Sequence, residues 1–294
     1  MHRRNFLALS LPLLARAANL SDFRLGVTSD EIDDDIAVAA TFLREFNLGW
    51  VEIRNIWGKY NTQQPVEKIR EARKIMDEHG VKLSALATPF FRGPVPMDDV
   101  ALDREWQLLE TAFNNAEILG STTIRTFAFT YQGKQTPDAA IYPRIYELQQ
   151  EAARRAKARG FRLAIETLGN SYVWSGSQAA ALLKAVPEDS LGLTWDPNNA
   201  ASIEERPFPE GYKRLDPARI FHVHLRDWKR DANGEVSWTA VGAGEFDNLG
   251  QIRALKRDGF KGTYTLETHW RSPQGKAHAT RVSLTELIKV FEQV

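Results

Sequence analysis

The feature that most constrains the fold is a strand-like run that recurs eight times along the chain. Each run is short and rich in β-branched or apolar residues. The runs cover 23–28, 50–54, 81–87, 122–129, 161–166, 191–196, 220–225 and 263–267. Between them, stretches such as 65–80 and 142–160 place apolar residues at helical spacing and end in a glycine that suits a left-handed C-cap. Eight strand–helix alternations over about 270 residues predict a single (β/α)8 TIM barrel.

A doubly wound open sheet is the alternative arrangement. Its cofactor signature would be a glycine-rich turn directly after an early strand, and none follows the runs that end at positions 28, 54 and 87. The tripeptide Gly242-Ala243-Gly244 lies in a loop after the seventh run and matches neither the dinucleotide fingerprint nor a P-loop. We interpret it as a turn, and the barrel is favoured.

The composition narrows the kinds of site that the chain can build. Lys plus Arg and Asp plus Glu are both 38, so the basic excess typical of nucleic-acid binding is missing. There is no cysteine, which excludes disulfides, thiolate metal ligands and cysteine nucleophiles. With only six histidines, a metal site must draw mainly on carboxylates.

The first 17 residues differ in character from the rest. They contain Arg3, Arg4 and Arg16, a short apolar run at 6–14 and no acid. A paired arginine followed by such a run and by an Ala-x-Ala sequence at 15–17 predicts a twin-arginine export signal. The run is too short to span a bilayer, so no stable membrane insertion is expected. Cleavage would remove three basic residues, leave residues 18–294 with a net charge of −3, and place the protein in the periplasm. The alternative is an uncleaved, amphipathic N-terminal helix on a cytoplasmic protein.

Polar side chains occupy the C-terminal ends of the last four runs. They are Glu166, Asp196, His224 and Glu267. In a parallel barrel these ends meet at one rim, where active sites are built. Because side chains alternate along a strand, inward-pointing polar residues require outward-pointing neighbours. The preceding residues are all bulky and apolar, as packing against helices requires: Ile165, Trp195, Val223 and Leu266. The same parity on four strands predicts that the four polar side chains converge.

Three carboxylates around one point repel one another unless they are protonated or bridged by a cation. Together with one imidazole they form an oxygen-rich donor set that suits Mn²⁺, Mg²⁺ or Co²⁺ and also accepts Zn²⁺. The residues therefore predict one divalent metal ion. The alternative is that each acid caps a helix or pairs with a basic residue.

Six segments of the chain resemble the xylose isomerase-like TIM barrel superfamily, the sugar phosphate isomerase/epimerase group. They are LGWVEIR, LAIETLGN, LTWDPNNA, FHVHLRDW, VGAGEFD and YTLETHW. The resemblance spans about residues 22–292. It implies one divalent metal held by Glu166, Asp196, His224 and Glu267. It also implies that Glu166 and Glu267 form an acid–base pair that moves a proton next to the carbonyl of a keto-sugar or polyol-derived substrate.

The chain departs from the ketose 3-epimerases of this superfamily at two positions. Asn199 stands where they have a histidine and Tyr172 where they have a second glutamate, whereas Arg230 matches their substrate-binding arginine. Together with His269, which follows Glu267 by two positions on the same side, Asn199 and Arg230 are the predicted substrate-binding residues.

Four further residues have predicted supporting positions. Glu52 and Arg125 are expected in a buried network, and His222 in the interior with its ring nitrogens satisfied. Asp227 is expected to orient a metal ligand or a nearby lysine.

Two other functions remain open at this stage. A lyase or dehydratase acting on a 3-keto-glycoside or an inosose would begin with the same proton abstraction, and a non-catalytic sugar-binding barrel would need none. An abasic-site endonuclease is disfavoured, because its zinc cluster needs many histidines and the first four runs contain none. The expected partner is a small carbohydrate and not a nucleic acid, and a homo-oligomer remains open.

Overall fold

The computed structural model describes residue 20 and residues 22–131, 138–200 and 205–294. The predicted export signal at 1–17 lies outside the described residues. None of the helices in the described ranges is long and apolar enough to cross a membrane.

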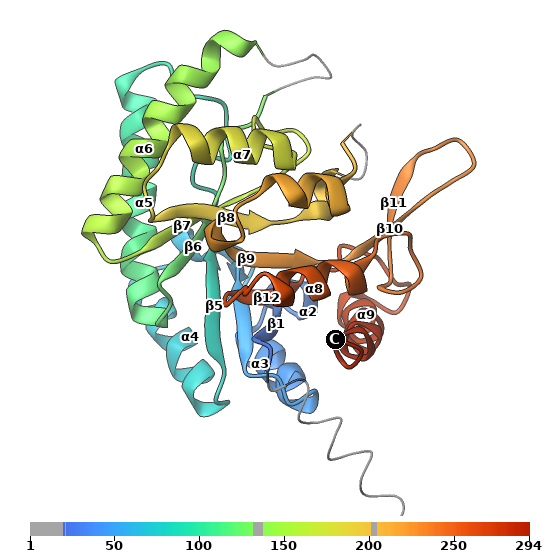
Figure 1. Cartoon of the computed structure of the whole chain (residues 1–294). Coiled ribbons are helices and arrows are strands. Elements are labelled where there is room, and N and C mark those ends of the chain that lie inside the picture. Colours follow the sequence, from blue (N-terminus) through green and yellow to red (C-terminus); the bar gives the residue numbers. More distant parts are fainter. Residues whose placement is uncertain (1–19, 21, 132–137, 201–204) are drawn as a thin grey trace, which may run out of the picture.

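Eight parallel strands form a closed barrel at the centre of the molecule (Figure 1). In chain order they are β1 (Leu25–Thr28), β2 (Trp50–Ile53), β5 (Lys82–Ala87), β6 (Thr123–Thr126), β7 (Arg162–Glu166), β8 (Leu191–Trp195), β9 (Ile220–Leu225) and β12 (Thr263–Leu266). The ring closes where β1 pairs in parallel with β12, in the register Gly26 to Thr265. The predicted (β/α)8 barrel is thereby confirmed, and the open sheet is excluded because no edge strand remains.

Helices surround this ring on the outside (Figure 1). They are α2 (Ser29–Ile32), α3 (Ile36–Glu45), α4 (Val66–Glu78), α5 (Asp99–Leu119), α6 (Tyr142–Ala158), α7 (Gly176–Ala185), α8 (Asn248–Arg257) and α9 (Lys276–Phe291). Several begin at a side chain that caps free backbone N–H groups, as Asp98 does for α5 and Ser175 for α7. Gly80 and Gly160 follow α4 and α6 with positive φ, as their positions in the sequence predict.

Short helical turns lie in the connections. They are η1 (Asn61–Gln63), η2 (Ala139–Ile141), η3 (Pro197–Ala200), η4 (Pro207–Gly211), η5 (Tyr212–Arg214) and η6 (Pro217–Arg219). Two antiparallel hairpins also follow barrel strands: β3 (Asn55–Ile56) with β4 (Lys59–Tyr60), and β10 (Asp227–Arg230) with β11 (Val236–Thr239). The second hairpin projects beyond the barrel (Figure 1). Neither hairpin is predicted by the sequence pattern.

The apolar core lies between the strands and the helices. Ile165, Trp195, Val223 and Leu266 are all fully buried in it. The indole N–H of Trp195 donates to Gln251 on α8 over 3.2 Å, so this side chain points outward to the helical layer. The polar residue that follows each of the four must then face the barrel interior, because alternate side chains of a strand point to opposite faces.

Candidate metal centre

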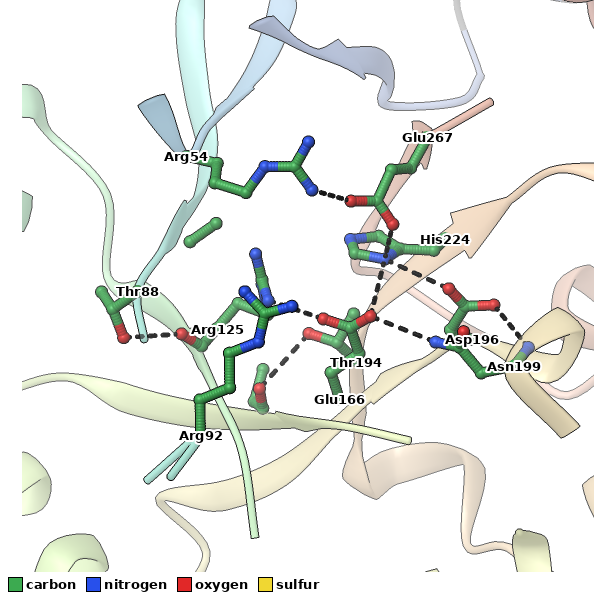
Figure 2. A network of polar contacts seen from close by, with 12 residues as sticks. Arg54, Thr88, Arg92, Arg125, Glu166, Thr194, Asp196, Asn199, His224 and Glu267 are labelled. Carbon is green, nitrogen blue, oxygen red and sulfur yellow. Dashed lines mark hydrogen bonds and ion pairs between the residues drawn. The ribbon is translucent and has the colours of Figure 1, made fainter. Parts of the chain in front are cut away.

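The four predicted ligands converge at one end of the barrel (Figure 2). All are buried, and one ligand atom from each lies within 4.8 Å of the others. The Nδ1 atom of His224 is 3.3 Å from Glu267 Oε2, 3.5 Å from Asp196 Oδ2 and 3.8 Å from Glu166 Oε1. Glu166 is the last residue of β7 and His224 lies on β9, whereas Asp196 and Glu267 directly follow β8 and β12.

Two polar atoms in this group have no hydrogen-bond partner among the described residues. They are His224 Nδ1 and Glu267 Oε2, and both are buried. Leaving a buried imidazole nitrogen and a buried carboxylate oxygen without a hydrogen bond is costly. A divalent cation among the four ligand atoms would satisfy both, so the residues present fit the metal that the donor set implies.

Glu52 controls which nitrogen of His224 faces the group. Glu52 Oε2 accepts hydrogen bonds from Nε2 of His224 (2.8 Å) and Nε2 of His222 (3.0 Å). With its proton on Nε2, His224 presents the lone pair of Nδ1 to the other three ligands. His222 completes the chain by accepting from the Thr263 hydroxyl at Nδ1 (2.6 Å), so it is an interior histidine with both nitrogens satisfied, as expected.

The electrostatics of these buried groups favour an ionised Glu52. Burial alone raises the pKa of Glu52, but attraction to His224 and the hydrogen bonds from His222 and His224 outweigh burial and hold that pKa well below its usual value. Burial lowers the pKa of His222, which keeps this ring neutral. Arg125 also approaches Glu52, with Nε 3.6 Å from Oε1, which places both residues in one buried network, as the sequence analysis expects.

Each carboxylate of the group also contacts an arginine. Arg125 Nη1 lies 2.7 Å from Glu166 Oε2, and Arg54 Nη1 lies 2.5 Å from Glu267 Oε1. In both glutamates the arginine contacts one carboxylate oxygen, and the other oxygen faces His224. Arg226 differs, because its Nη2 contacts Asp196 Oδ2, the oxygen that faces His224. The arginines lower the repulsion between the three carboxylates.

Arg54 and Arg226 are not among the residues predicted for the site. Both could have been found by alternation, because Arg54 follows Glu52 by two positions and Arg226 follows His224 by two. A charged residue in an inward-pointing position at a strand end is the signal that marks them.

Two of the three predicted substrate-binding residues lie beside the group. The Asn199 amide donates to Glu166 Oε1 over 3.2 Å, and its oxygen accepts from Arg226 over 2.7 Å. His269 Nδ1 lies 2.5 Å from Arg226 Nη1, and its Nε2 lies 3.4 Å from Glu267 Oε1. Asn199 and His269 therefore both contact residues of the predicted metal centre.

Arg230, the third, lies at the exposed end of strand β10. Its guanidinium donates to the carbonyl of Gly234 over 3.3 Å and lies 5.1 Å from the ring centre of Trp228. Its part in substrate binding stays a prediction.

Asp227 has another role than the one expected. Its carboxylate accepts hydrogen bonds from the backbone N–H groups of Trp228, Gly242, Gly244 and Phe246, over 2.9 to 3.2 Å. It therefore joins the start of the β10–β11 hairpin to the loop that follows the hairpin. The glycine-containing tripeptide at 242–244 is part of this loop, as its interpretation as a turn implies.

Solved structures with the same fold share little sequence with the chain. A xylose isomerase-like TIM barrel protein from Mycobacterium smegmatis in complex with magnesium is 18% identical (TM-score 0.68; 87% of this chain and 88% of that chain covered). The IOLI protein with a binding zinc atom is 17% identical (TM-score 0.76; 92% of this chain and 99% of that chain covered). The 3-keto-D-glucoside 4-epimerase from E. coli is 16% identical (TM-score 0.71; 91% of this chain and 99% of that chain covered). At these identities the likeness establishes the fold.

A search of curated protein sequences found no match. The profile described as "Xylose isomerase-like TIM barrel" matches residues 40–288, which is most of the sequence. That range includes all four residues of the predicted metal centre. The chain belongs to the xylose isomerase-like TIM barrel family.

Proposed function

We propose that the chain is a divalent-metal-dependent sugar isomerase or epimerase, which abstracts a proton next to the carbonyl of a keto-sugar or polyol-derived substrate. The observation that carries the proposal is the buried group of three carboxylates and one imidazole, in which His224 Nδ1 and Glu267 Oε2 have no hydrogen-bond partner among the described residues. Support also comes from the similar folds, since an epimerase acting on a keto-glucoside is among them.

Glu166 and Glu267 are the proposed acid–base pair. In the barrel their strands, β7 and β12, are separated by β8 and β9, so the two carboxylates approach the centre from different sides. One removes the proton and the other returns one to the opposite face. Burial raises the pKa of Glu267, but His269 and His224 outweigh this and hold that pKa well below its usual value, so the group is ionised and able to accept a proton. A bound divalent ion would polarise the substrate carbonyl and acidify the neighbouring C–H.

Deuterium incorporation tests this proposal. Purified protein is incubated in D₂O with added Mn²⁺ and a panel of keto-sugars and glycosides, and the products are analysed by NMR and mass spectrometry. We expect deuterium at one carbon next to the carbonyl. Glu166→Gln and Glu267→Gln should each reduce the rate by about 10²- to 10⁴-fold, because each variant removes one partner of the proton transfer.

The control is Glu78→Gln, which changes an exposed glutamate on α4 and should leave the rate unchanged. Full activity of Glu267→Gln would contradict the assignment. The same products separate the alternatives: a lyase or dehydratase releases a leaving group, and a sugar-binding barrel binds without incorporating deuterium.

Export through a twin-arginine signal also remains a proposal, and so does a homo-oligomeric state. N-terminal sequencing of the protein from the periplasm of its native host tests the first. A chain that begins at residue 18 is expected, and one that begins at Met1 would contradict the predicted cleavage.

A further inference from the structure

Arg92 lies at the rim of the barrel, in the loop between β5 and α5. This loop is anchored to the segment that follows β6, since the Thr130 hydroxyl donates to the carbonyl of Arg92 over 2.7 Å. The neighbouring Phe91 is fully buried, with its ring centre 4.2 Å from that of Phe129. The side chain of Arg92 is exposed, and its Nη1 donates to the Tyr60 hydroxyl on β4 over 2.7 Å. Hydrogen bonds therefore fix Arg92 at its backbone carbonyl and at its guanidinium, while the side chain remains open to solvent.

The ring of Phe127 connects Arg92 to the candidate metal centre. The guanidinium carbon of Arg92 lies 5.4 Å from the centre of this ring, and that of Arg125 lies 4.8 Å from it. Arg125 in turn contacts Glu166, one of the predicted ligands. Figure 2 shows the Arg92 side chain extending from its loop toward Arg125 and Glu166. Arg92 is thus placed on the side of the centre where Glu166 lies.

Arg92 differs from the arginines deeper in the barrel because no carboxylate in the described ranges pairs with its charge. Arg54, Arg125 and Arg226 each form ion pairs with buried carboxylates. Arg92 forms no ion pair with any residue in the described ranges, and its hydrogen bond to Tyr60 occupies one of five guanidinium donors. Two parallel donors of a guanidinium match a carboxylate or a phosphate, and a charge-assisted pair of this kind is both strong and directional.

We propose that Arg92 binds an anionic group of the substrate, a carboxylate or a phosphate, while the substrate carbonyl lies at the centre beside Glu166. The substrate class is then an anionic keto-sugar. This inference rests on the proposed function, because it assumes that a sugar carbonyl occupies that centre. Tyr60 is the residue that positions the guanidinium, through the hydrogen bond that its hydroxyl accepts from Arg92 Nη1.

Binding of three matched ketoses to the Mn²⁺-loaded protein tests the inference. The three ketoses differ at one end of the molecule. D-fructose has a neutral hydroxyl there, D-fructuronate has a carboxylate, and D-fructose 6-phosphate has a phosphate. By isothermal titration calorimetry, at least one anionic ketose is expected to bind about 10- to 100-fold more tightly than D-fructose. The tighter of the two anionic ketoses identifies the source of the charge. Equal or weaker binding of both anionic ketoses would overturn the inference.

Arg92→Met should remove this preference, and Arg92→Lys should restore part of it, since lysine keeps the charge but not the paired donors. The matched control is Arg70→Met, which removes the same charge from the exposed side of α4 and should keep the preference. A preference that survives Arg92→Met would also overturn the inference. Unchanged Mn²⁺ affinity of Arg92→Met reports that the variant is folded.

The two proposals fail in different ways. If the anion preference depends on Arg92 but no sugar incorporates deuterium, the proposed function fails and the anion site stands. If neutral sugars incorporate deuterium and Arg92→Met changes no affinity, the anion site fails and the proposed function stands.

Discussion

At the scale of single residues, the Glu52 carboxylate is the group that prepares His224 for a metal. It lies on β2, across the barrel interior from β9, and accepts the Nε2 proton of His224 over 2.8 Å. An amide in its place could donate to that nitrogen as well as accept, so the ring proton would be free to occupy Nδ1. We expect Glu52→Gln to weaken Mn²⁺ binding by about 10- to 100-fold. Calorimetric titration of the metal-free protein measures this.

The control for Glu52→Gln is Glu71→Gln, on the exposed face of α4, whose affinity for Mn²⁺ should equal that of the wild type. A Glu52→Gln protein that is folded, as judged by circular dichroism, and binds Mn²⁺ as tightly as the wild type would contradict the role assigned to Glu52.

The residues of the centre could be predicted to the extent that alternation along one strand determines them. Glu166, Asp196, His224 and Glu267 were found in this way, because each follows a bulky apolar neighbour at a strand end. Alternation also places Arg54 and Arg226 on the inward face, but it does not show which carboxylate each arginine contacts, because the contacts of Arg226 with Asp196 and of Arg54 with Glu267 join segments far apart in the chain. Asp227 shows the same limit, since three of the four backbone groups that it binds belong to a loop 15 or more positions further along.

At the scale of elements, strands β1 and β2 approach closely at a glycine. Gly26 pairs with Trp50, and a Cβ atom at Gly26 would lie 2.5 Å from the Trp50 carbonyl oxygen. Backbone atoms cannot move aside as a flexible side chain can, so Gly26→Ala should distort this pairing. We expect a loss of about 1 to 3 kcal/mol in the free energy of unfolding, measured by urea denaturation.

Gly93→Ala is the matched control for Gly26→Ala. Nothing lies within 4 Å of the position that its Cβ would take, so its stability should stay within about 0.5 kcal/mol of the wild type. Similar losses in the two variants would show that the close approach at Gly26 does not limit the substitution.

The elements themselves were predictable where periodicity is long. The helical patterns at 65–80 and 142–160 correspond to α4 and α6, including the glycines that follow them. The run at 122–129 was overestimated, because β6 ends at Thr126 and Phe127 to Phe129 continue as loop, held by backbone bonds to Phe90 and Phe91. Both hairpins were missed, since their strands of two and four residues lie in the connections and not in the strand–helix alternation on which the prediction rests.

At the scale of the whole molecule, the candidate centre joins distant parts of the chain. Its four residues span positions 166 to 267, and Glu52 and Arg54 add β2 from the other side of the β1–β12 closure. These groups are close together only when the ring is complete. A cation that binds all four ligands therefore binds the folded barrel and has little affinity for the unfolded chain.

Metal binding should consequently stabilise the entire barrel. At a free Mn²⁺ concentration 100 times the dissociation constant, linkage adds about 2.7 kcal/mol to the free energy of unfolding. For a domain of this size that corresponds to a rise in Tm of about 5 °C, which differential scanning calorimetry of EDTA-treated protein with and without Mn²⁺ would detect. His224→Ala removes the only nitrogen among the four ligand atoms and should abolish the rise, while Mn²⁺ bound non-specifically at exposed carboxylates would raise the Tm of both proteins alike. An equal shift in the two proteins would therefore place the stabilising metal elsewhere, and a shift confined to the wild type would place it at the barrel centre.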